Sequence, residues 1–116
     1  MAVPVTMEVK VTNHDSVKIV EVEGEVDLYS SPKLRKVLLD LTKSEHKAIL
    51  VDLNKVKYMD SSGIATLVEA LQQVGKYHGK LKLTNLREAV KDVFELSRLD
   101  KVFDIYLNNE DALKSF

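Results

Sequence analysis

The stretch of sequence that decides the fold is AILVDLNKVKYMDSSGIATLVEALQQVGKYHGKLKLT, residues 48–84. Its first six residues, 48–53, form a short and nearly continuous apolar run. Such a run is typical of a strand that is covered on both faces, so it predicts a central position in a sheet. The more polar residues that follow, 54–60, are predicted to form a loop.

A helix is predicted after this loop, because apolar residues recur there at helical spacing, at Ile64, Leu67, Val68, Leu71, Val74 and His78. Gly79 is predicted to end the helix. Residues 81–84 (LKLT) then have the composition of another short strand. The stretch therefore predicts a strand-helix-strand unit with two parallel strands and a right-handed crossover.

The residues before this unit predict a β-hairpin. Residues 7–12 alternate between apolar and polar side chains, as a half-buried strand does, and the turn formers of 13–15 follow. Residues 17–23 are rich in β-branched side chains and stop at Gly24. Two strands separated by so short a turn pair antiparallel.

A helix is also predicted after the loop of residues 24–30. Pro32 is tolerated in the first helical turn, and the serine oxygens before it can accept hydrogen bonds from the first amides of the helix. The apolar side chains share one helical face, at Leu34, Val37, Leu38 and Leu41.

The C-terminal residues predict a helix at 87–97, a short strand at 105–107 and a last helix at 110–115. The first of these helices is expected to turn Leu86, Ala89, Val90, Val93 and Phe94 inward. With no internal repeat or linker, the element order β-β-α-β-α-β-α-β-α predicts one α/β domain over residues 1–116.

Composition excludes several classes of function. The 116 residues include 17 basic and 18 acidic side chains, a net charge of −1, so there is no positive field to hold nucleic acid or an anionic membrane. Cysteine is absent, which excludes disulfides and thiolate sites. No segment has the roughly 20 apolar residues that span a bilayer, and the N-terminus does not look like a secretory signal. We expect a cytoplasmic protein without cofactors.

One strand-to-helix junction is chemically distinctive: Met59-Asp60-Ser61-Ser62-Gly63. Switches and ligands in α/β sheets tend to lie at such junctions, because amide hydrogens and the helix dipole converge there. The same letters are also what an ordinary helix start requires, with Asp60 or Ser61 as the cap and Gly63 allowing close packing. The four letters alone leave both interpretations open.

A second cluster, Gly24-Glu25-Val26-Asp27, follows the predicted hairpin. Together with AILVDL, the loop VKYMDSSGI and the helix after it, this cluster makes nearly the whole chain resemble the STAS domain of anti-sigma factor antagonists. The resemblance implies a mixed sheet of four to five strands flanked by about four helices. It also implies that the GEVD loop lies beside the DSSG loop.

In that family the first serine after the aspartate is phosphorylated by an anti-sigma factor that is a serine kinase, and the matching residue is Ser61. The resemblance implies that the unphosphorylated protein binds this kinase and releases a sigma factor, and that a serine phosphatase resets the switch. Asp27 and Asp60 match the family's acidic positions, and Ser62, Gly63 and Ile64 lie around the phosphorylation site. The protein is then a ligand and a substrate, not an enzyme, and is expected to be a monomer alone.

A phosphoryl group adds about 1.5 to 2 negative charges and three acceptor oxygens. Free amides and the dipole of the helix are expected to tolerate that charge, so the fold should survive. A partner that covers a neutral hydroxyl would have to bury or repel the charge, and a loss of about 4 kcal/mol weakens a complex about a thousandfold.

The residues leave some site assignments open and exclude others. Ser62 is a rival phosphorylation site that only the family pattern disfavours, and Ile64 and Leu67 fit either a partner contact or the core. The dispersed His14, His46 and His78 argue against a metal site or a serine hydrolase, and no phosphate-loop motif is present.

Two alternative functions use the same loop. One is a STAS-like interaction subunit in a stress-signalling or lipid-transport complex, without regulated phosphorylation. The other is a small-molecule sensor that holds a phosphate or nucleotide at the helix start. Thermal stabilisation by a ligand would distinguish the sensor from a protein-binding module.

Overall fold

The computed structural model describes residues 7–116 and places them in five strands and four α-helices around one sheet. The elements, in chain order, are β1 (Met7–His14), β2 (Val17–Val26), α1 (Ser31–Lys43), β3 (Ala48–Met59), α2 (Ser61–Lys76), β4 (Lys80–Thr84), α3 (Glu88–Leu96), a 3-10 turn (Leu99–Lys101), β5 (Asp104–Tyr106) and α4 (Asn109–Lys114). This order and the α/β class are as predicted.

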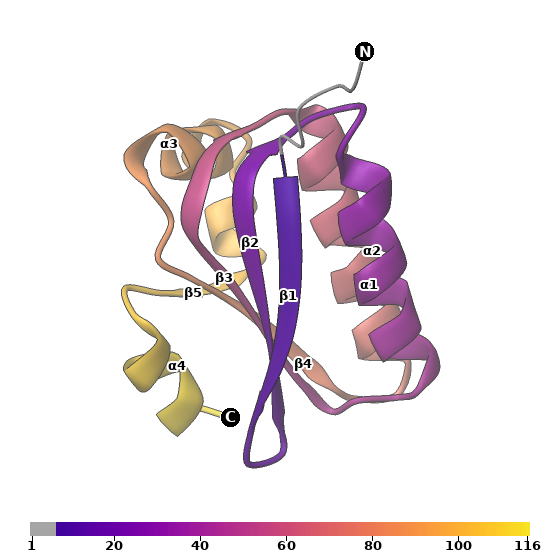
Figure 1. Cartoon of the computed structure of the whole chain (residues 1–116). Coiled ribbons are helices and arrows are strands. Elements are labelled where there is room, and N and C mark those ends of the chain that lie inside the picture. The colour runs from indigo at the N-terminus through magenta and orange to yellow at the C-terminus, as the bar shows by residue number, and fades with distance from the viewer. Residues whose placement is uncertain (1–6) are drawn as a thin grey trace.

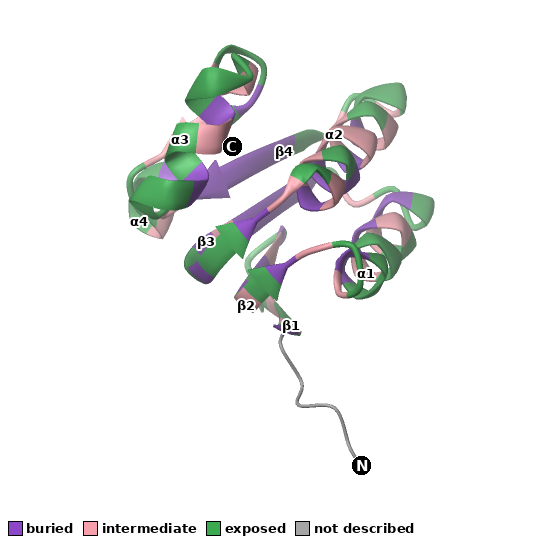
Figure 2. Ribbon diagram, turned by 90° about the horizontal axis from the view of Figure 1, so that it is seen from above, coloured by how far each residue is buried: buried purple, intermediate pink, exposed green. Residues whose placement is uncertain are grey.

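The sheet has the strand order β1-β2-β3-β4-β5. β1 and β2 are antiparallel, and the other neighbours are parallel, so the sheet is mixed. Figures 1 and 2 show α1 and α2 on one side of the sheet and α3 and α4 on the other. β3 is central, as its apolar run predicts, and Ile49, Leu50 and Val51 are fully buried.

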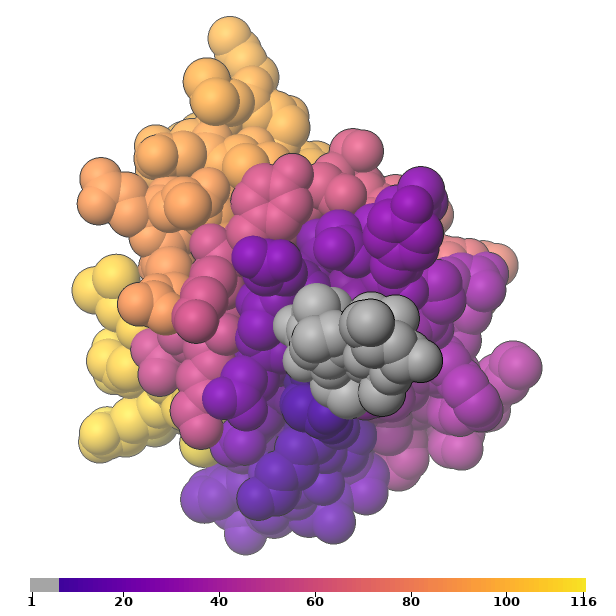
Figure 3. Space-filling model, turned by 45° about the horizontal axis from the view of Figure 1, so that its top comes forward, coloured from indigo at the N-terminus to yellow at the C-terminus, as the bar shows by residue number. Residues whose placement is uncertain are grey.

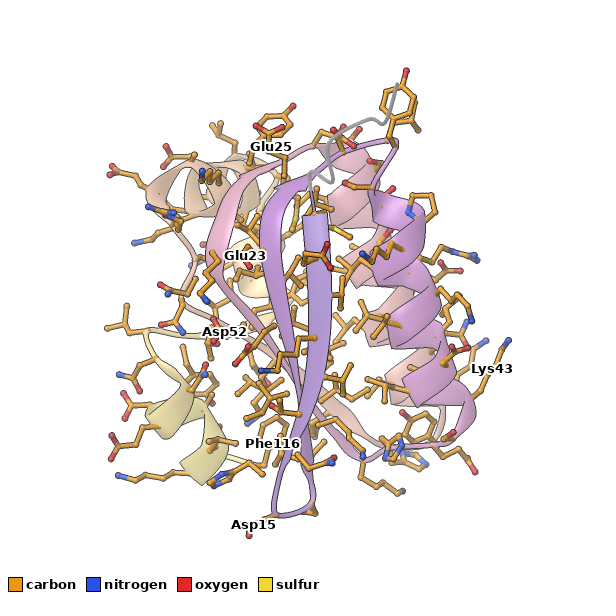
Figure 4. The ribbon with its side chains drawn as sticks, in the orientation of Figure 1. Asp15, Glu23, Glu25, Lys43, Asp52 and Phe116 are labelled. Atoms are coloured by element: carbon orange, nitrogen blue, oxygen red, sulfur yellow. The ribbon has the colours of Figure 1, made fainter. Side chains whose placement is uncertain are left out.

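The main core lies under α1 and α2. Leu34 and Leu38 of α1 and Leu67 and Val74 of α2 are almost completely buried, which follows from their helical spacing. α3 and α4 cover only part of the opposite face of the sheet, and Ala112 of α4 packs in a small second cluster. The uncovered part of that face is charged, and Figure 4 shows Glu23, Glu25 and Asp52 pointing to this side, away from α1 and α2.

The structure corrects several predicted strand ends. β1 runs to His14 rather than residue 12, and β5 covers Asp104–Tyr106 rather than 105–107. β2 does not stop at Gly24 but runs to Val26, because Gly24 adopts a φ of 109° at an irregularity where the register with β3 shifts. Residues 54–59 are not a loop but continue β3, so only Asp60 separates that strand from α2. The charged side chains that suggested a loop are exposed, as at Lys55 and Lys57.

Smaller predictions about the helices also fail. The serine oxygens do not cap α1: the side chain of Ser30 bonds back to the preceding turn, where its Oγ accepts a hydrogen bond from the Asp27 amide at 2.9 Å. Ala89 is exposed, while Val90 and Phe94 are buried as expected. α2 ends at Lys76, before Gly79, and His78 is exposed with a φ of 62°.

Candidate functional site

Two loops meet at one end of the molecule, where β2 and β3 finish side by side. The last residues of the two strands, Val26 and Met59, are register partners. The amide of Asp60, the next residue after β3, donates a hydrogen bond to the Val26 carbonyl at 3.0 Å. The GEVD and DSSG segments are therefore adjacent. Figure 3 shows this end of the molecule turned toward the viewer.

Asp60 is the cap of α2. Its Oδ1 accepts hydrogen bonds from the amides of Ser62 at 2.9 Å and Gly63 at 3.3 Å, and also from the Ser62 hydroxyl. Its main-chain carbonyl accepts from the Ile64 amide at 3.1 Å. These contacts occupy most of the amides that a helix start leaves without a partner, so the amides expected to be free for a phosphate are already in use.

The same contacts hold the Asp60 carboxylate in its charged form. The hydrogen bond from the Ser62 hydroxyl is the largest cause that lowers the pKa of Asp60, and the amides of Ser62, Gly63 and Leu28 lower it further. The Leu28 amide belongs to the turn after β2. Asp60 is thus an anion at the point where its main-chain amide joins the two segments through the Val26 carbonyl.

Ser61 and Ser62 have different surroundings although they are neighbours in the sequence. Ser61 is the first residue of α2 and is exposed, and its hydroxyl forms no hydrogen bond with any of the described residues 7–116. Ser62 is half-buried, and its hydroxyl donates to Asp60. Of the two hydroxyls, only that of Ser61 is available to a partner without breaking the cap.

Asp27 stabilises its own turn. Its Oδ1 accepts hydrogen bonds from the amides of Tyr29 at 2.9 Å and Ser30 at 3.0 Å. The Ser30 hydroxyl in turn donates to the Glu25 carbonyl at 2.8 Å. The carboxylate therefore fixes the path from β2 into α1 and thereby the shape of the loop that lies beside Asp60.

Gly63 is buried where α2 passes over the ends of β2 and β3. A methyl group at this position would lie 2.6 Å from Met59 Cγ and 2.8 Å from Val26 Cγ1, closer than any normal contact. The glycine thus allows the close approach that was one of its two predicted roles. Leu67 is completely buried and belongs to the core, and Ile64 is half-buried and packs against it.

Exposed apolar side chains surround the site, and none of them was predicted from the sequence as part of it. Leu28 is 68% exposed, Tyr29 90% and Tyr58 51%. Leu28 and Tyr29 lie in the turn after β2, and Tyr58 precedes Met59 at the end of β3. Large apolar residues in a turn next to a motif can be recognised in a sequence. They predict a contact surface, because side chains in such a turn do not contribute to the core.

Other kinds of site find no support among the described residues. The three histidines lie on separate segments: the end of β1, the turn before β3 and the turn after α2. No group of three His, Asp or Glu side chains within residues 7–116 is arranged to hold a metal ion. In the same part of the chain, no helix combines the length and the apolar character needed to span a bilayer.

A family model and two relatives that are known proteins point to the same family. The model of the STAS domain family matches residues 8–112. The anti-sigma-B factor antagonist of Bacillus subtilis (strain 168) is 35% identical over 95 residues, which are 82% of this chain and 86% of that protein. The anti-sigma-B factor antagonist of Listeria monocytogenes is 30% identical over 101 residues, 87% of this chain and 88% of that protein.

A solved structure agrees over almost the whole length. The anti-sigma factor antagonist from Mycobacterium paratuberculosis superposes with a TM-score of 0.89 at 28% identity, covering 99% of this chain and 97% of that one. The similarity therefore includes the arrangement of all five strands and four helices.

Proposed function

Since this chain belongs to the STAS-domain family of anti-sigma factor antagonists, we propose that it is a partner switch controlled by phosphorylation of Ser61. In its unphosphorylated form it binds an anti-sigma factor that is also a serine kinase, and a sigma factor is released. The kinase phosphorylates Ser61, the complex dissociates, and a serine phosphatase restores the binding form. Residues 1–116 act as one STAS-like domain in the cytoplasm, as a regulator and not an enzyme.

The observation that carries this proposal is the contrast between the two serine hydroxyls. A kinase has to bring the hydroxyl oxygen in line with the γ-phosphate of ATP, so the oxygen must be accessible. Ser61 is exposed at the first position of α2, whereas the Ser62 hydroxyl donates a hydrogen bond to the Asp60 carboxylate. This contrast favours Ser61 on structural grounds that are independent of the family pattern.

The state of Asp60 supports an outward-facing phosphoryl group. Because the amides of Ser62 and Gly63 already bond to Asp60, a phosphoryl group on Ser61 cannot take these donors without displacing a carboxylate whose pKa is lowered. Repulsion by that carboxylate and the occupied amides turn the phosphoryl group toward solvent. The fold remains intact, and the added charge lies on the surface that a partner would cover.

The apolar side chains around Ser61 provide the contact area. Tyr29 and Leu28 on one loop and Tyr58 at the end of β3 are exposed, and tyrosine is enriched among the residues that dominate binding energy. Burying these side chains also excludes water from Ser61 in the complex. A dianion trapped in such an interface costs several kcal/mol, and about 4 kcal/mol corresponds to about a thousandfold loss of affinity.

The proposal can be tested with the anti-sigma factor kinases encoded in the same genome. The purified protein is incubated with each kinase, ATP and Mg²⁺, and the phosphate is located by mass spectrometry. We expect phosphate on Ser61 in the wild type and in Ser62→Ala, and none in Ser61→Ala. Calorimetric titration with the same kinase should show binding by the unphosphorylated protein and a loss of about a thousandfold after phosphorylation.

Ser62→Ala is the matched control, because it removes a hydroxyl of the same kind from the adjacent position. Phosphate on Ser62, or equal affinity of the phosphorylated and unphosphorylated proteins, would contradict the switch. If every kinase binds but none transfers phosphate, the result would favour the constitutive interaction subunit instead.

A further inference from the structure

β1 lies at an edge of the sheet, and Figure 1 views the molecule onto that edge. Within residues 7–116, β1 pairs with β2 only. Proteins usually keep such edges short, cover them or place charges against pairing, because an open edge is a template for another strand. β1 has eight residues, and Val11 on it is an apolar side chain that is 40% exposed.

The hairpin register determines which backbone groups point outward. β1 and β2 are joined by a two-residue turn, so the flanking pair His14 and Val17 is a hydrogen-bonded pair, and such pairs alternate along the ladder. The even-numbered residues of β1 then bond to β2, and the odd-numbered residues 7, 9 and 11 direct their amides and carbonyls to the open edge. The Met7 carbonyl agrees with this, since it accepts a hydrogen bond at 3.3 Å from Lys33 Nζ of α1.

We propose that the open edge of β1 pairs antiparallel with β1 of a second copy of this chain, with Val9 opposite Val9 and Glu8 opposite Lys10. In this register the outward-facing groups of residues 7, 9 and 11 meet those of residues 11, 9 and 7. Two Glu-Lys pairs form on one face of the joined sheet. On the other face, the exposed Val11 lies against Met7 of the second copy.

The charges of Glu8 and Lys10 favour this register over the registers shifted by two residues. Only registers that oppose odd-numbered residues bring the outward-facing groups together. A shift of two residues in one direction places Glu8 opposite Glu8, and a shift in the other direction places Lys10 opposite Lys10. Like charges directly opposite each other destabilise a sheet, whereas opposite charges stabilise it. The sequence Glu8-Val9-Lys10 is therefore complementary to itself in one antiparallel register.

The lysine that lies over the edge is compatible with this pairing. Lys33 Nζ is 3.3 Å from Glu8 Oε2, and both side chains are largely exposed. Glu8 would then lie between two ammonium groups, one from its own α1 and one from the second copy. Lys33 shields one end of the edge in the monomer and limits the affinity, so we expect a reversible dimer that forms at high concentration, with the monomer as the dilute form.

The antiparallel arrangement leaves the proposed switch accessible. A two-fold axis through Val9 reverses the direction of the second copy, so the two Ser61 ends point to opposite ends of a continuous ten-stranded sheet. Each copy can then bind its own partner. The proposal does not depend on phosphorylation, and neither Glu8 nor Lys10 belongs to the switch.

Charge reversal provides the sharpest test. Sedimentation velocity of the wild type at rising concentration should show a weight-average sedimentation coefficient that increases toward the dimer value. Glu8→Lys and Lys10→Glu should each stay monomeric, because each places like charges opposite each other. An equimolar mixture of the two variants should regain dimers, since both cross-strand pairs then have opposite charges.

A crosslink tests the register itself. The chain contains no cysteine, so Val9→Cys introduces a single thiol. The Cα atoms of a hydrogen-bonded antiparallel pair are about 5.5 Å apart, within the range of a disulfide. Mild oxidation should therefore convert Val9→Cys to a covalent dimer at least tenfold faster than Val11→Cys. A wild type that stays monomeric at all concentrations, a mixture that does not recover dimers, or equal crosslinking rates would overturn the proposal.

Discussion

Replacing Gly63 by alanine should destabilise the protein, although alanine is the better helix former. The added methyl carbon would lie 2.6 Å from Met59 Cγ and 2.8 Å from Val26 Cγ1, with Met59 Sδ at 3.3 Å. Both neighbours are buried, Met59 at 1% exposure and Val26 at 0%, so neither can move into solvent. Overpacking of this kind costs about 1–3 kcal/mol.

Part of that cost is offset. Alanine gains about 0.5–1 kcal/mol over glycine in a helix interior, and the gain is smaller in the first turn, where Gly63 lies. The expected net loss is about 1–2 kcal/mol in the free energy of unfolding. Gly75 is the matched control in the same helix, because it is exposed and a methyl group there would meet nothing within 4 Å. Gly75→Ala should stabilise the protein by up to about 1 kcal/mol.

Urea denaturation followed by far-ultraviolet circular dichroism measures both variants. The midpoint should fall for Gly63→Ala and rise or stay unchanged for Gly75→Ala, with the same slope as the wild type. If Gly63→Ala is as stable as Gly75→Ala, then α2 does not need the close approach to the ends of β2 and β3. Glycine would then not be required at position 63 for packing α2 against Met59 and Val26.

Three further changes test other parts of the structure. Asp60→Ala should lose about 1 kcal/mol of stability at neutral pH. Because the cap lowers the pKa of Asp60, the urea midpoints of the variant and the wild type should converge as the pH falls below about 4, and a constant difference would contradict the cap. Asn109→Ala should lose about 1–3 kcal/mol in the free energy of unfolding, because it removes the 3.0 Å hydrogen bond to Asp52 and the hydrogen bond from the Thr84 hydroxyl. An equal loss in Glu110→Ala, a change at the exposed neighbouring residue, would argue against a role for these two hydrogen bonds. Tyr29→Ala should weaken kinase binding about tenfold or more in calorimetry with unfolding changed by less than about 0.5 kcal/mol, and unchanged affinity would remove Tyr29 from the proposed interface.

The elements could be predicted from sequence where a single local pattern determined them. Leu34 and Leu38 recur at helical spacing and both are fully buried, and the run at 48–53 is the centre of the sheet. The end of β3 could not be predicted this way, because Lys55 and Lys57 are solvated side chains in a strand that has lost one of its neighbours. Their polarity is the same in a loop and in a half-exposed strand.

Contacts between distant residues were also outside the reach of local patterns. Asp52 accepts hydrogen bonds at 3.0 Å from the amide groups of Asn85 and Asn109, which lie far along the chain, so no spacing indicates them. The difference between Ser61 and Ser62 has the same origin, since it depends on which hydroxyl the Asp60 carboxylate engages. The motif could be found from its letters, but the accessible hydroxyl required the geometry.

The unequal lengths of the strands explain why the candidate site is so accessible. β4 ends at Thr84, opposite Asp52, while β3 continues to Met59, and among residues 7–116 it pairs there with β2 alone. β1 accompanies β2 as far as Gly24, whose partner on β3 is Val56, so the last residues of β2 and β3, 25–26 and 57–59, extend past the rest of the sheet as a short ribbon. Irregularities near Gly24 allow the register to change there. Tyr58 within this ribbon and Ser61 just after it are both exposed. A β3 that ended at residue 53, as its apolar run predicts, would end nearly level with β4, and the motif would then not project beyond the rest of the sheet.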